Sequence, residues 1–559
     1  MVGNSAAAGP RLEGGASVTA TAHSRRRDTA GVAGLIFLWL AATAWARPLA
    51  LPDEGRYVTV AWEMLRSGDW LTPTLGGLPF FHKPPLFYWI TAGSLSLFGL
   101  NEWAARAAPI LGAWLGAFGL YLFVRRWSGD RAARLTLLVL LLQPLFYVGG
   151  QFANLDMLVA GCISATILLF AHAALSIEHG LPHRNALLAA YATAALGVLS
   201  KGLIGAVIPA LVILCWLATM QRWRVLRSLF SLPAAGVFLV LAAPWFIAMQ
   251  ANFADFLNYF FVVQQFKRFA GSGFNNLQPV WFYPAVLLLF SVPWLPWLYR
   301  SLRQRDLTDP GRGTLRLLMW LWLAMVVLFF SMPRSKLLGY VLPALPPLAF
   351  LVADGFLTLV APSRGAKRLW WGGSVIGAVI SVGAVVVFSV RPPHSTRELA
   401  WVLGTQRAPG EPVFMLNHFY YDVPFYARLD GRVSVVDDWA NPEVQKSDNW
   451  RKELADAGRF APLRSASTLI SAASLPAELC GAPVSWVIGA GTSASEHPFL
   501  ANAGAVFTQR NTSLWRVDRA SPATARVLRC QKVEQTIPMA PAANEAVRLG
   551  ALAEHADRP

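Results

Sequence analysis

The chain has 559 residues, of which 55% are hydrophobic and 14% charged, and its formal net charge is +17 at pH 7. Soluble globular domains carry about 25% charged residues. The composition therefore excludes an ordinary soluble protein and predicts a polytopic helical membrane protein. Many arginines lie in short loops between apolar runs, where they orient the chain rather than bind a ligand. The remaining basic residues fall on the other side and suggest an anionic partner such as a phosphate.

The N-terminal region sets the predicted orientation. Residues 1–24 are rich in Ala, Gly and Ser and are predicted to be a disordered cytoplasmic segment. Three arginines at 25–27 precede the apolar run 30–46, which favours a cytoplasmic N-terminus. The ending ATAWA resembles a signal-peptidase site, but many apolar runs follow, so an uncleaved signal anchor is favoured. The loop 51–103 then lies outside the cytoplasm.

A transmembrane domain is predicted over residues 25–390. Each of its apolar runs is near the length that crosses a bilayer; they cover 30–46, 104–124, 132–149, 156–176, 186–200, 203–219, 228–249, 280–299, 315–331, 337–360 and 368–390. That makes about eleven transmembrane helices, and a split or re-entrant pair would raise the number to thirteen. Basic loops follow the even-numbered runs, as a cytoplasmic start requires. An odd number of crossings leaves the C-terminus outside.

The outer stretch 51–89, LPDEGRYVTVAWEMLRSGDWLTPTLGGLPFFHKPPLFYW, is the candidate active site. Charged groups this dense beside a bilayer are costly unless they handle a charged ligand. Four other outer loops carry charge that orientation does not require: ANLDM around Asp156, LSKG at Lys201, the long loop 250–279, and MPRSKLLGY at 332–340. Acids and bases from five loops are thus expected to meet on one membrane face.

Hydropathy drops after residue 390, and a small periplasmic α/β domain is predicted over 391–540, followed by a flexible tail at 541–559. PVFML, RVSVV, SWVIGAG and TSLWRV are predicted to be short buried strands, with helices at Val423–Leu429 and Trp450–Phe460. Cys480 and Cys530 are expected to form a disulfide if this domain is periplasmic. Cys162 and Cys215 lie in apolar runs and are expected to be inert.

At LPDEGRY followed by GLPFFHKPPLFYW, the chain resembles the membrane glycosyltransferases of the GT-C superfamily, which use polyprenyl-phosphate sugars. Within it, the chain is most similar to the bacterial 4-amino-4-deoxy-L-arabinose (lipid A) transferases, related to the protein O-mannosyltransferases. ANLDM, LSKG, FKRF (Phe266 to Phe269) and PRSKLLGY also match. The resemblance covers nearly the whole membrane part and is weak over 391–559. His82 stands where these transferases carry Glu, and Gln264 and Gln265 stand where a His is expected.

The resemblance implies transfer of 4-amino-4-deoxy-L-arabinose from undecaprenyl phosphate to a lipid A phosphate, with resistance to polymyxin and other cationic peptides as the outcome. It places the protein in the bacterial inner membrane, with the site and C-terminal domain facing the periplasm. The expected partners are the undecaprenyl phosphate-linked donor, lipid A and membrane lipids, without nucleic acid, and the protein is expected to be a monomer. The alternatives are a relative that uses another sugar or a protein or glycan acceptor, and a lipid-linked sugar transporter. Transporters usually show paired inverted halves, whereas the outer charges of this chain are expected to gather on one membrane face.

Asp53 is the catalytic candidate. It would be the general base for a hydroxyl acceptor; for a phosphate acceptor it would orient the acceptor, stabilise the oxocarbenium-like transition state or hold the sugar ammonium. A helix N-cap is the alternative. The cations expected to bind donor or acceptor phosphate are Arg56, Lys83, Lys201, Arg268, Arg334 and Lys336, each of which could instead snorkel at the interface. The residues expected to contact sugar or phosphate are Glu54, Tyr57, Asp156 and Tyr340.

A metal ion is a further alternative. His82 could ligate a divalent ion together with Asp53 or Glu54. One His and scattered carboxylates are weak evidence for a metal site. No cofactor is therefore expected to be required.

Overall fold

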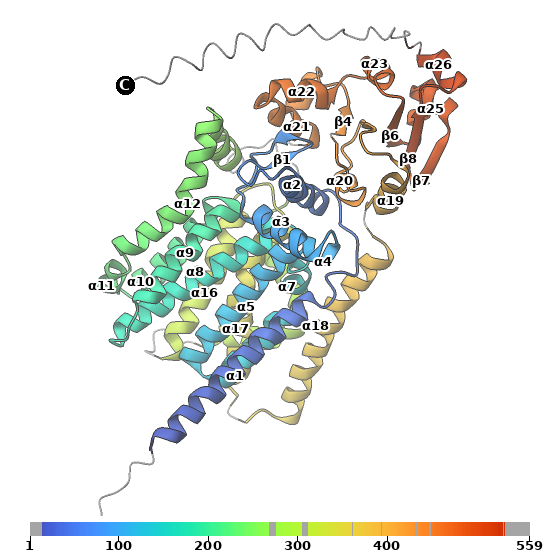
Figure 1. Ribbon diagram of the computed structural model, residues 1–559. Coiled ribbons are helices and arrows are strands. Elements are labelled where there is room, and N and C mark those ends of the chain that lie inside the picture. Colours follow the sequence, from blue (N-terminus) through green and yellow to red (C-terminus); the bar gives the residue numbers. More distant parts are fainter. Residues whose placement is uncertain are drawn as a thin grey trace, which may run out of the picture.

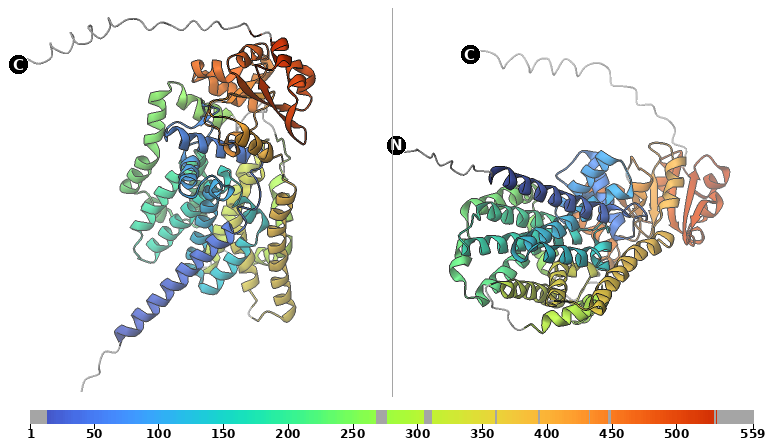
Figure 2. Two further views of the ribbon diagram at one scale, coloured as in Figure 1. Left: turned by 45° about the vertical axis from the view of Figure 1, so that its right-hand side comes forward. Right: turned by 90° about the horizontal axis from the view of Figure 1, so that it is seen from below.

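The computed structural model describes residues 14–267, 276–304, 311–359, 361–392, 394–431, 433–446, 449–528 and 530. A helical bundle forms one part, and a smaller domain with all of the longer strands caps one end of it (Figure 1). Two turned views show the same arrangement, with helix α18 leading from the bundle to the cap (Figure 2). The expected polytopic helical protein with a C-terminal α/β domain is confirmed.

The helices of the bundle and its outer loops follow the predicted apolar runs closely. They are α1 (Gly14–Ala41), α2 (Asp53–Ser67), α3 (Leu86–Phe98), α4 (Glu102–Ala105), α5 (Ala107–Ser128), α6 (Asp130–Leu141), α7 (Pro144–Gly149), α8 (Leu155–Glu178), α9 (Arg184–Lys201), α10 (Ile204–Thr219), α11 (Trp223–Ser228), α12 (Leu232–Asn252), η1 (Asn258–Lys267), α14 (Phe282–Phe290), η2 (Val292–Trp294), α15 (Leu295–Leu302), α16 (Arg312–Ser331), η3 (Leu338–Ala344), α17 (Leu345–Leu357) and α18 (Arg364–Val390).

Every one of the eleven predicted runs contains helix, but not all are single straight spans. In the described residues, six helical segments are long and apolar enough to cross a membrane, and a seventh span results if α14 and the η2–α15 segment count as one. That pair is bent by 71°, where Pro293 and Pro296 interrupt the backbone ladder. The run 132–149 is likewise split, into α6 and α7, just before Pro144. The number of crossings stays a prediction.

The N-terminal expectation needs one correction. Residues 1–13 lie outside the described part, but residues 14–24, expected to be disordered, already form the start of α1. Ala is the strongest helix former, and an alanine-rich stretch that leads directly into an apolar helix extends it.

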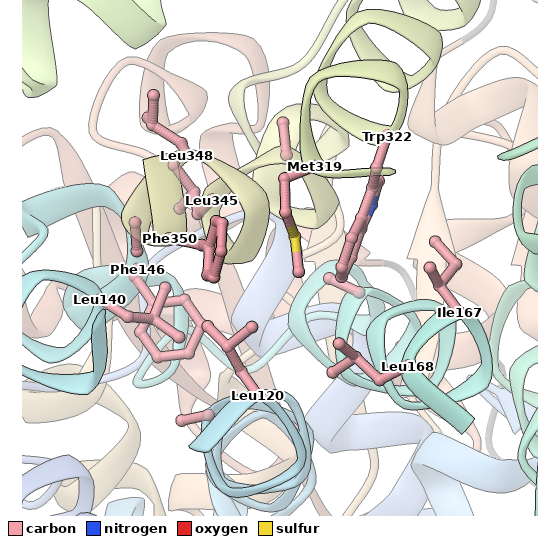
Figure 3. Packing of buried hydrophobic residues seen from close by; sticks show 14 of the residues in the cluster. Leu120, Leu140, Phe146, Ile167, Leu168, Met319, Trp322, Leu345, Leu348 and Phe350 are labelled. Carbon is pink, nitrogen blue, oxygen red and sulfur yellow. The ribbon is translucent and has the colours of Figure 1, made fainter. Parts of the chain in front are cut away.

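Close helix packing holds the bundle together. Gly112 of α5 and Gly161 of α8 lie so close that a Cβ on either would overlap the backbone of the other helix. Small residues allow such approach where lipid supplies no hydrophobic driving force between helices. Around this crossing, side chains from α5, α6, α8, α16 and α17 form one buried apolar cluster; Figure 3 shows Leu120, Leu168 and Met319 among them.

The C-terminal domain is a six-stranded sheet with the order β5-β4-β3-β6-β8-β7. The first four strands are parallel, and β8 and β7 add an antiparallel edge. Its elements are α19 (Arg397–Gln406), β3 (Val413–Leu416), α20 (Val423–Tyr426), β4 (Val433–Val436), η4 (Pro442–Gln445), α21 (Trp450–Arg459), α22 (Pro462–Thr468), β5 (Leu469–Ile470), α23 (Leu475–Cys480), β6 (Val484–Ala490), α24 (Ser493–Glu496), α25 (Pro498–Ala503), β7 (Ala505–Gln509), β8 (Thr512–Asp518) and α26 (Pro522–Leu528).

The four predicted strands and both predicted helices of this domain are confirmed, and a disulfide joins Cys480 to Cys530 as expected. Two strands were missed. β5 has only two residues, and β7 is an edge strand whose side chains are mostly exposed, so neither shows a buried apolar pattern. The tail expected at 541–559 lies outside the described residues.

The domain packs on the first outer loop. The loop contains α2, α3 and a small hairpin of β1 (Thr74–Leu75) and β2 (Leu78–Pro79). Val58 and Val60 of α2 share one buried cluster with Phe419, Tyr421 and other apolar residues of the C-terminal domain. The Thr59 hydroxyl also donates to the Tyr421 carbonyl at 2.5 Å. The C-terminal domain therefore lies directly over the stretch that carries Asp53.

Candidate active site

Helix α2 presents the acidic motif of the first outer loop. Asp53 and Arg56 are three residues apart and Tyr57 is four from Asp53, so all three lie on one side of the helix. The Arg56 guanidinium forms an ion pair with Asp53 and lies over the Tyr57 ring, 5.1 Å from its centroid. Asp53 keeps 32% of its side chain exposed, so its carboxylate remains open to a cavity.

Glu54 points the other way. It is fully buried and pairs with Arg47 and with Arg106, whose Nε donates at 2.9 Å. The backbone N–H of Ala153 also donates to it at 2.8 Å. Burial alone would raise the pKa of Glu54, but Arg106 and Arg47 outweigh it and lower the pKa to about 2. The expected contact between Glu54 and the sugar or phosphate is wrong, because this side chain ties α2 to the bundle.

Arg56 has a second acidic partner that comes from the C-terminal domain. Its Nη1 donates to Glu453 Oε1 of α21 at 2.5 Å, and the other carboxylate oxygen accepts from the Tyr421 hydroxyl at 3.3 Å. Burial alone would lower the pKa of Arg56, but the charge of Glu453 outweighs it and raises that pKa further. Arg56 therefore carries a permanent positive charge held between two carboxylates.

The loop after β2 brings His82 and Lys83 to the same place. The His82 ring stacks on Phe80 with centroids 4.7 Å apart, and the Tyr259 hydroxyl lies 3.0 Å from His82 Nε2. Gln264 Nε2 in turn donates to the Tyr259 hydroxyl at 2.9 Å. Lys83 lines the cavity beside them.

Two helix ends of the bundle supply a further ion pair. Asp156 lies in the first turn of α8, and Lys201, the last residue of α9, donates to its carboxylate. Asn154 caps α8 and donates to Asp156 Oδ2 at 3.2 Å. The Lys201 ammonium lies 4.3 Å from the centroid of the Tyr340 ring. Gly339 packs so tightly on Asp156 that a Cβ there would overlap its carboxylate.

A small cavity of about 60 Å³ joins these groups. The predicted residues that line it are Asp53, Arg56, Tyr57, His82, Lys83, Asp156, Lys201 and Tyr340. Asp53, Arg56 and Glu453 also line a larger cleft of about 950 Å³ that lies between α2 and the C-terminal domain. Asp53 thus lies where a compact charged cavity opens into a wide cleft.

Two predicted phosphate ligands within the described residues, Lys336 and Arg334, do not line the cavity. The Lys336 side chain is buried and its ammonium donates to the carbonyls of Gln278 (3.0 Å) and Pro333 (2.5 Å), so a role in phosphate binding is wrong for it. It joins two outer loops instead. The Arg334 side chain is exposed and does not line the cavity. Arg268 lies outside the described residues, and its role stays a prediction.

The metal alternative finds little support in the donor set. Within the described ranges, no three His, Cys, Asp or Glu side chains come close enough together to hold an ion. Glu54, a proposed co-ligand of His82, is occupied by its two arginines. The His82 ring is instead oriented by Phe80 and Tyr259.

Sequence reasoning missed the residues that hold the site together. Arg47 and Arg106 are buried partners of Glu54, and Asn154 orients Asp156. An arginine inside the apolar context NEWAARAAP was the available signal for Arg106, since buried charges are normally paired. Glu453 had no such signal, because a charged residue on a helix of a soluble domain is ordinary.

Comparison with known proteins agrees with this geometry. Residues 82–247 match the family model described as dolichyl-phosphate-mannose-protein mannosyltransferase. An "Undecaprenyl phosphate-alpha-4-amino-4-deoxy-L-arabinose arabinosyl transferase 2" of Pseudomonas fluorescens is 32% identical over 62% of this chain and 62% of its own length. A transferase with the same name but no numeral, from Aeromonas hydrophila, is 34% identical over 62% of this chain and 64% of its own. The chain therefore spans less than two thirds of the length of these relatives.

The solved structures extend the likeness to the fold. The crystal structure of ArnT from Cupriavidus metallidurans bound to undecaprenyl phosphate aligns with a TM-score of 0.74 and 22% identity, over 89% of this chain and 98% of that one. Its apo state gives a TM-score of 0.71. The fold is therefore the one seen in that enzyme, and the resemblance to the GT-C polyprenyl-phosphate glycosyltransferases is confirmed.

Proposed function

We propose that this protein transfers 4-amino-4-deoxy-L-arabinose from undecaprenyl phosphate to a phosphate of lipid A. One observation carries the proposal: cations and carboxylates from five separate segments converge on one cavity at the outer end of the bundle. The relatives named as aminoarabinose transferases and the shared fold support this choice of donor and sugar.

The small cavity suits the donor phosphate. A water molecule takes up about 30 Å³ of liquid volume, so a cavity of about 60 Å³ accepts a compact group. Lys83 and Arg56 supply positive charge, and fixed cations stabilise the negative charge that builds on a departing lipid phosphate. Asp156, oriented by Asn154 and Lys201, is placed to contact the ammonium of the sugar.

We place Asp53 beside the bond between the sugar and the donor phosphate, which is broken in the transfer. Transfer breaks the bond between the anomeric carbon and the donor phosphate oxygen and forms one to the acceptor phosphate oxygen. Because the acceptor phosphate is already anionic near neutral pH, it needs little deprotonation. We assign Asp53 the stabilisation of positive charge on the sugar ring in the transition state and the orientation of the acceptor. In a transfer to a hydroxyl, the same carboxylate would be the general base.

We propose that the side chains supply the positive charge and that no metal ion is required, since the described donor set does not form a metal site. We also propose that the protein lies in the bacterial inner membrane as a monomer, with this face in the periplasm. The arginine-rich loops at the opposite end of the bundle support that orientation. Addition of the sugar would lower the negative charge of lipid A and protect against polymyxin.

Two substitutions test the site. Asp53→Asn and Lys83→Ala should each abolish sugar transfer while expression and membrane insertion remain normal, with lipid A analysed by mass spectrometry in a host that lacks its own enzyme. Asp438→Asn and Lys446→Ala are matched controls, since both residues are exposed in the C-terminal domain and outside the cavity. Full activity of both site variants would remove this cavity from the mechanism. Failure of the inserted wild-type protein to modify lipid A would refute the proposed substrate pair.

A related transferase for a protein or another glycan is the second candidate. The match of residues 82–247 to a protein mannosyltransferase model favours it, as does the HKPP sequence with His82 in place of Glu. Mass spectrometry of total periplasmic protein and glycan from the same host would reveal such products.

A further inference from the structure

Another cleft lies at the end of the bundle opposite the C-terminal domain, between α1, α5 and the first turns of α6. Helix α1 begins at that end (Figure 1) and packs against α5. We name this space of about 1040 Å³ the α1–α5 cleft. It shares no lining residue with the candidate active site. Its arginines follow the orientation rule, but that rule does not explain why three of them line one cleft together with apolar side chains.

The polar end of the α1–α5 cleft is positively charged. Residues 27–30 and 125–134 contain five arginines and two aspartates, which leaves a net charge of +3. Arg126 lines the cleft and is exposed. Its guanidinium lies 5.3 Å from the centroid of the Trp127 ring, and the ion pairs formed there among the described residues do not include it. Arg126 can therefore bind an anion without giving up an ionic partner.

Two other arginines share both aspartates of the cleft through mostly long contacts. Arg125 Nη2 lies 3.5 Å from Asp28 Oδ2, and its Nε lies 3.3 Å from Asp130 Oδ1. Arg134 Nη2 lies 3.3 Å from Asp28 Oδ1, and its Nε lies 2.8 Å from Asp130 Oδ2. Charge-assisted hydrogen bonds are usually about 2.7–2.9 Å long, and exposed ion pairs contribute little stability. Because 59% of its side chain is exposed, Arg134 can turn to a stronger acceptor such as a phosphate, which a guanidinium binds with two parallel hydrogen bonds.

The α1–α5 cleft becomes apolar deeper along α5. Phe118, Leu122 and Arg126 all line it and are spaced four residues apart, so they lie on one side of the helix with the arginine at its end. Leu122 exposes 40% of its surface. Beyond Phe118, Trp114 Nε1 donates to the Ala33 carbonyl at 3.0 Å and ties α1 to α5. A surface that changes from apolar to basic along one helix matches a lipid with an acyl chain and an anionic headgroup, whereas a free phosphate would leave the apolar part uncovered.

Basic clefts between the helices of membrane proteins bind the headgroups of anionic lipids. We propose that the α1–α5 cleft binds an anionic phospholipid, with the headgroup phosphate on Arg126 and Arg134 and one acyl chain along Phe118 and Leu122. Arg125 stays with the aspartates and keeps the helices together. The bound lipid fills the space between α1 and α5 and holds them against each other. This inference requires only the location in a membrane, so it can be tested separately from sugar transfer.

Lipid binding to the purified full-length protein in detergent tests the site, with bound lipids counted by native mass spectrometry. Dioleoyl phosphatidylglycerol should bind about tenfold more tightly than dioleoyl phosphatidylcholine, which has the same chains and a phosphate but no net charge. Arg126→Gln and Arg134→Gln should each weaken the binding of phosphatidylglycerol about tenfold, through the loss of a hydrogen bond between charged groups. Arg224→Gln is the matched control, because Arg224 is an exposed arginine of α11 outside this cleft and its variant should bind like wild type.

Several outcomes would overturn the inference. One is binding of phosphatidylglycerol within twofold of wild type by a variant that carries both cleft substitutions, and another is an equal loss in Arg224→Gln. Equal binding of the two lipids by wild type would do the same, and that comparison needs no variant to fold. In thermal unfolding, phosphatidylglycerol should raise the Tm of wild type by a few degrees and inorganic phosphate should not. Equal protection by both would assign the cleft to free phosphate instead of a lipid.

Discussion

Glu453 offers the sharpest test of how the candidate site is organised, because it is a C-terminal domain residue that reaches Arg56, beside the catalytic candidate Asp53. Its carboxylate accepts from Arg56 at 2.5 Å and from the Tyr421 hydroxyl at 3.3 Å. Glu453→Gln keeps the size of the side chain and removes its charge. We expect the variant to lose transfer activity because the uncharged amide oxygen of Gln holds Arg56 less strongly, so that Arg56 shifts toward Asp53.

The magnitude follows from the contact. The two side chains are largely buried, with exposed fractions of 10% for Glu453 and 15% for Arg56, so solvent screens them little. A hydrogen bond to a charged group contributes about 1.5–3 kcal/mol. If that energy positions Arg56 in the transition state, its loss lowers the transfer rate about ten- to a hundredfold, since roughly 1.4 kcal/mol is a factor of ten. Apolar packing between α2 and the C-terminal domain remains, so the domain should stay docked.

Transfer rates of purified wild type, Glu453→Gln, Arg56→Lys and the double variant would measure this effect. If Glu453 acts through Arg56, the loss should shrink in the Arg56→Lys background, and the coupling free energy should exceed about 0.5 kcal/mol. Glu443→Gln is the control, because Glu443 forms an exposed ion pair on the same domain. Activity of Glu453→Gln within twofold of wild type, or additive losses in the double variant, would refute the reasoning.

Three further predictions concern the other ion pairs and the disulfide. Because the pKa of Glu54 is lowered from 4.5 to about 2, this group stabilises the fold by about 3 kcal/mol above pH 4.5 and loses that contribution as pH falls toward 2. In thermal unfolding in detergent, Glu54→Gln should therefore be less stable than wild type at pH 6, and its stability should fall less steeply below pH 4.5. An equally steep loss of stability in acid would contradict this. Asp156→Asn and Lys201→Met should each slow transfer about tenfold or more, and the double variant should be little worse; fully additive losses would show independent roles. Cys480→Ser should lower the stability of the C-terminal domain by about 2–4 kcal/mol. It should also abolish the difference in gel mobility with and without reductant that the native disulfide is expected to cause. If wild-type protein showed no such difference, the bond would be in doubt.

The parts of the site that could be predicted are those with a local signal. Asp53, Arg56 and Tyr57 follow one another at helical spacing, and Asp156 and Lys201 are charges at the ends of otherwise apolar helices. Such residues stand out because a bilayer makes charge costly. The charges in the outer loops also predicted that these loops meet on one membrane face. Eight of the predicted side chains do line one cavity.

The errors have equally local causes. Adjacent residues on a helix point about 100° apart, so Asp53 can face the cavity while Glu54 faces the bundle. The sequence of the acidic pair does not indicate which of the two side chains faces the cavity. Ion pairs with the buried Arg47 and Arg106 direct Glu54 toward the bundle. Lys336 was misassigned for the same reason, since its partners are backbone carbonyls that have no sequence signature.

Glu453 shows why the C-terminal domain could not be given a role from sequence, and why its position matters. It lies 397 residues from Arg56 along the chain, and the packing of apolar residues such as Phe419 and Tyr421 against α2 brings the two together. That contact combines a buried apolar core with the hydrogen bonds of Thr59 and Arg56 to the domain, and close packing of this kind tolerates little change in shape. Asp53, the catalytic candidate, lies at the inner end of the larger cleft, so the position of the domain sets the space beside its carboxylate. The C-terminal domain therefore forms part of the wall of the candidate site, and α2 and α21 each line both of its cavities.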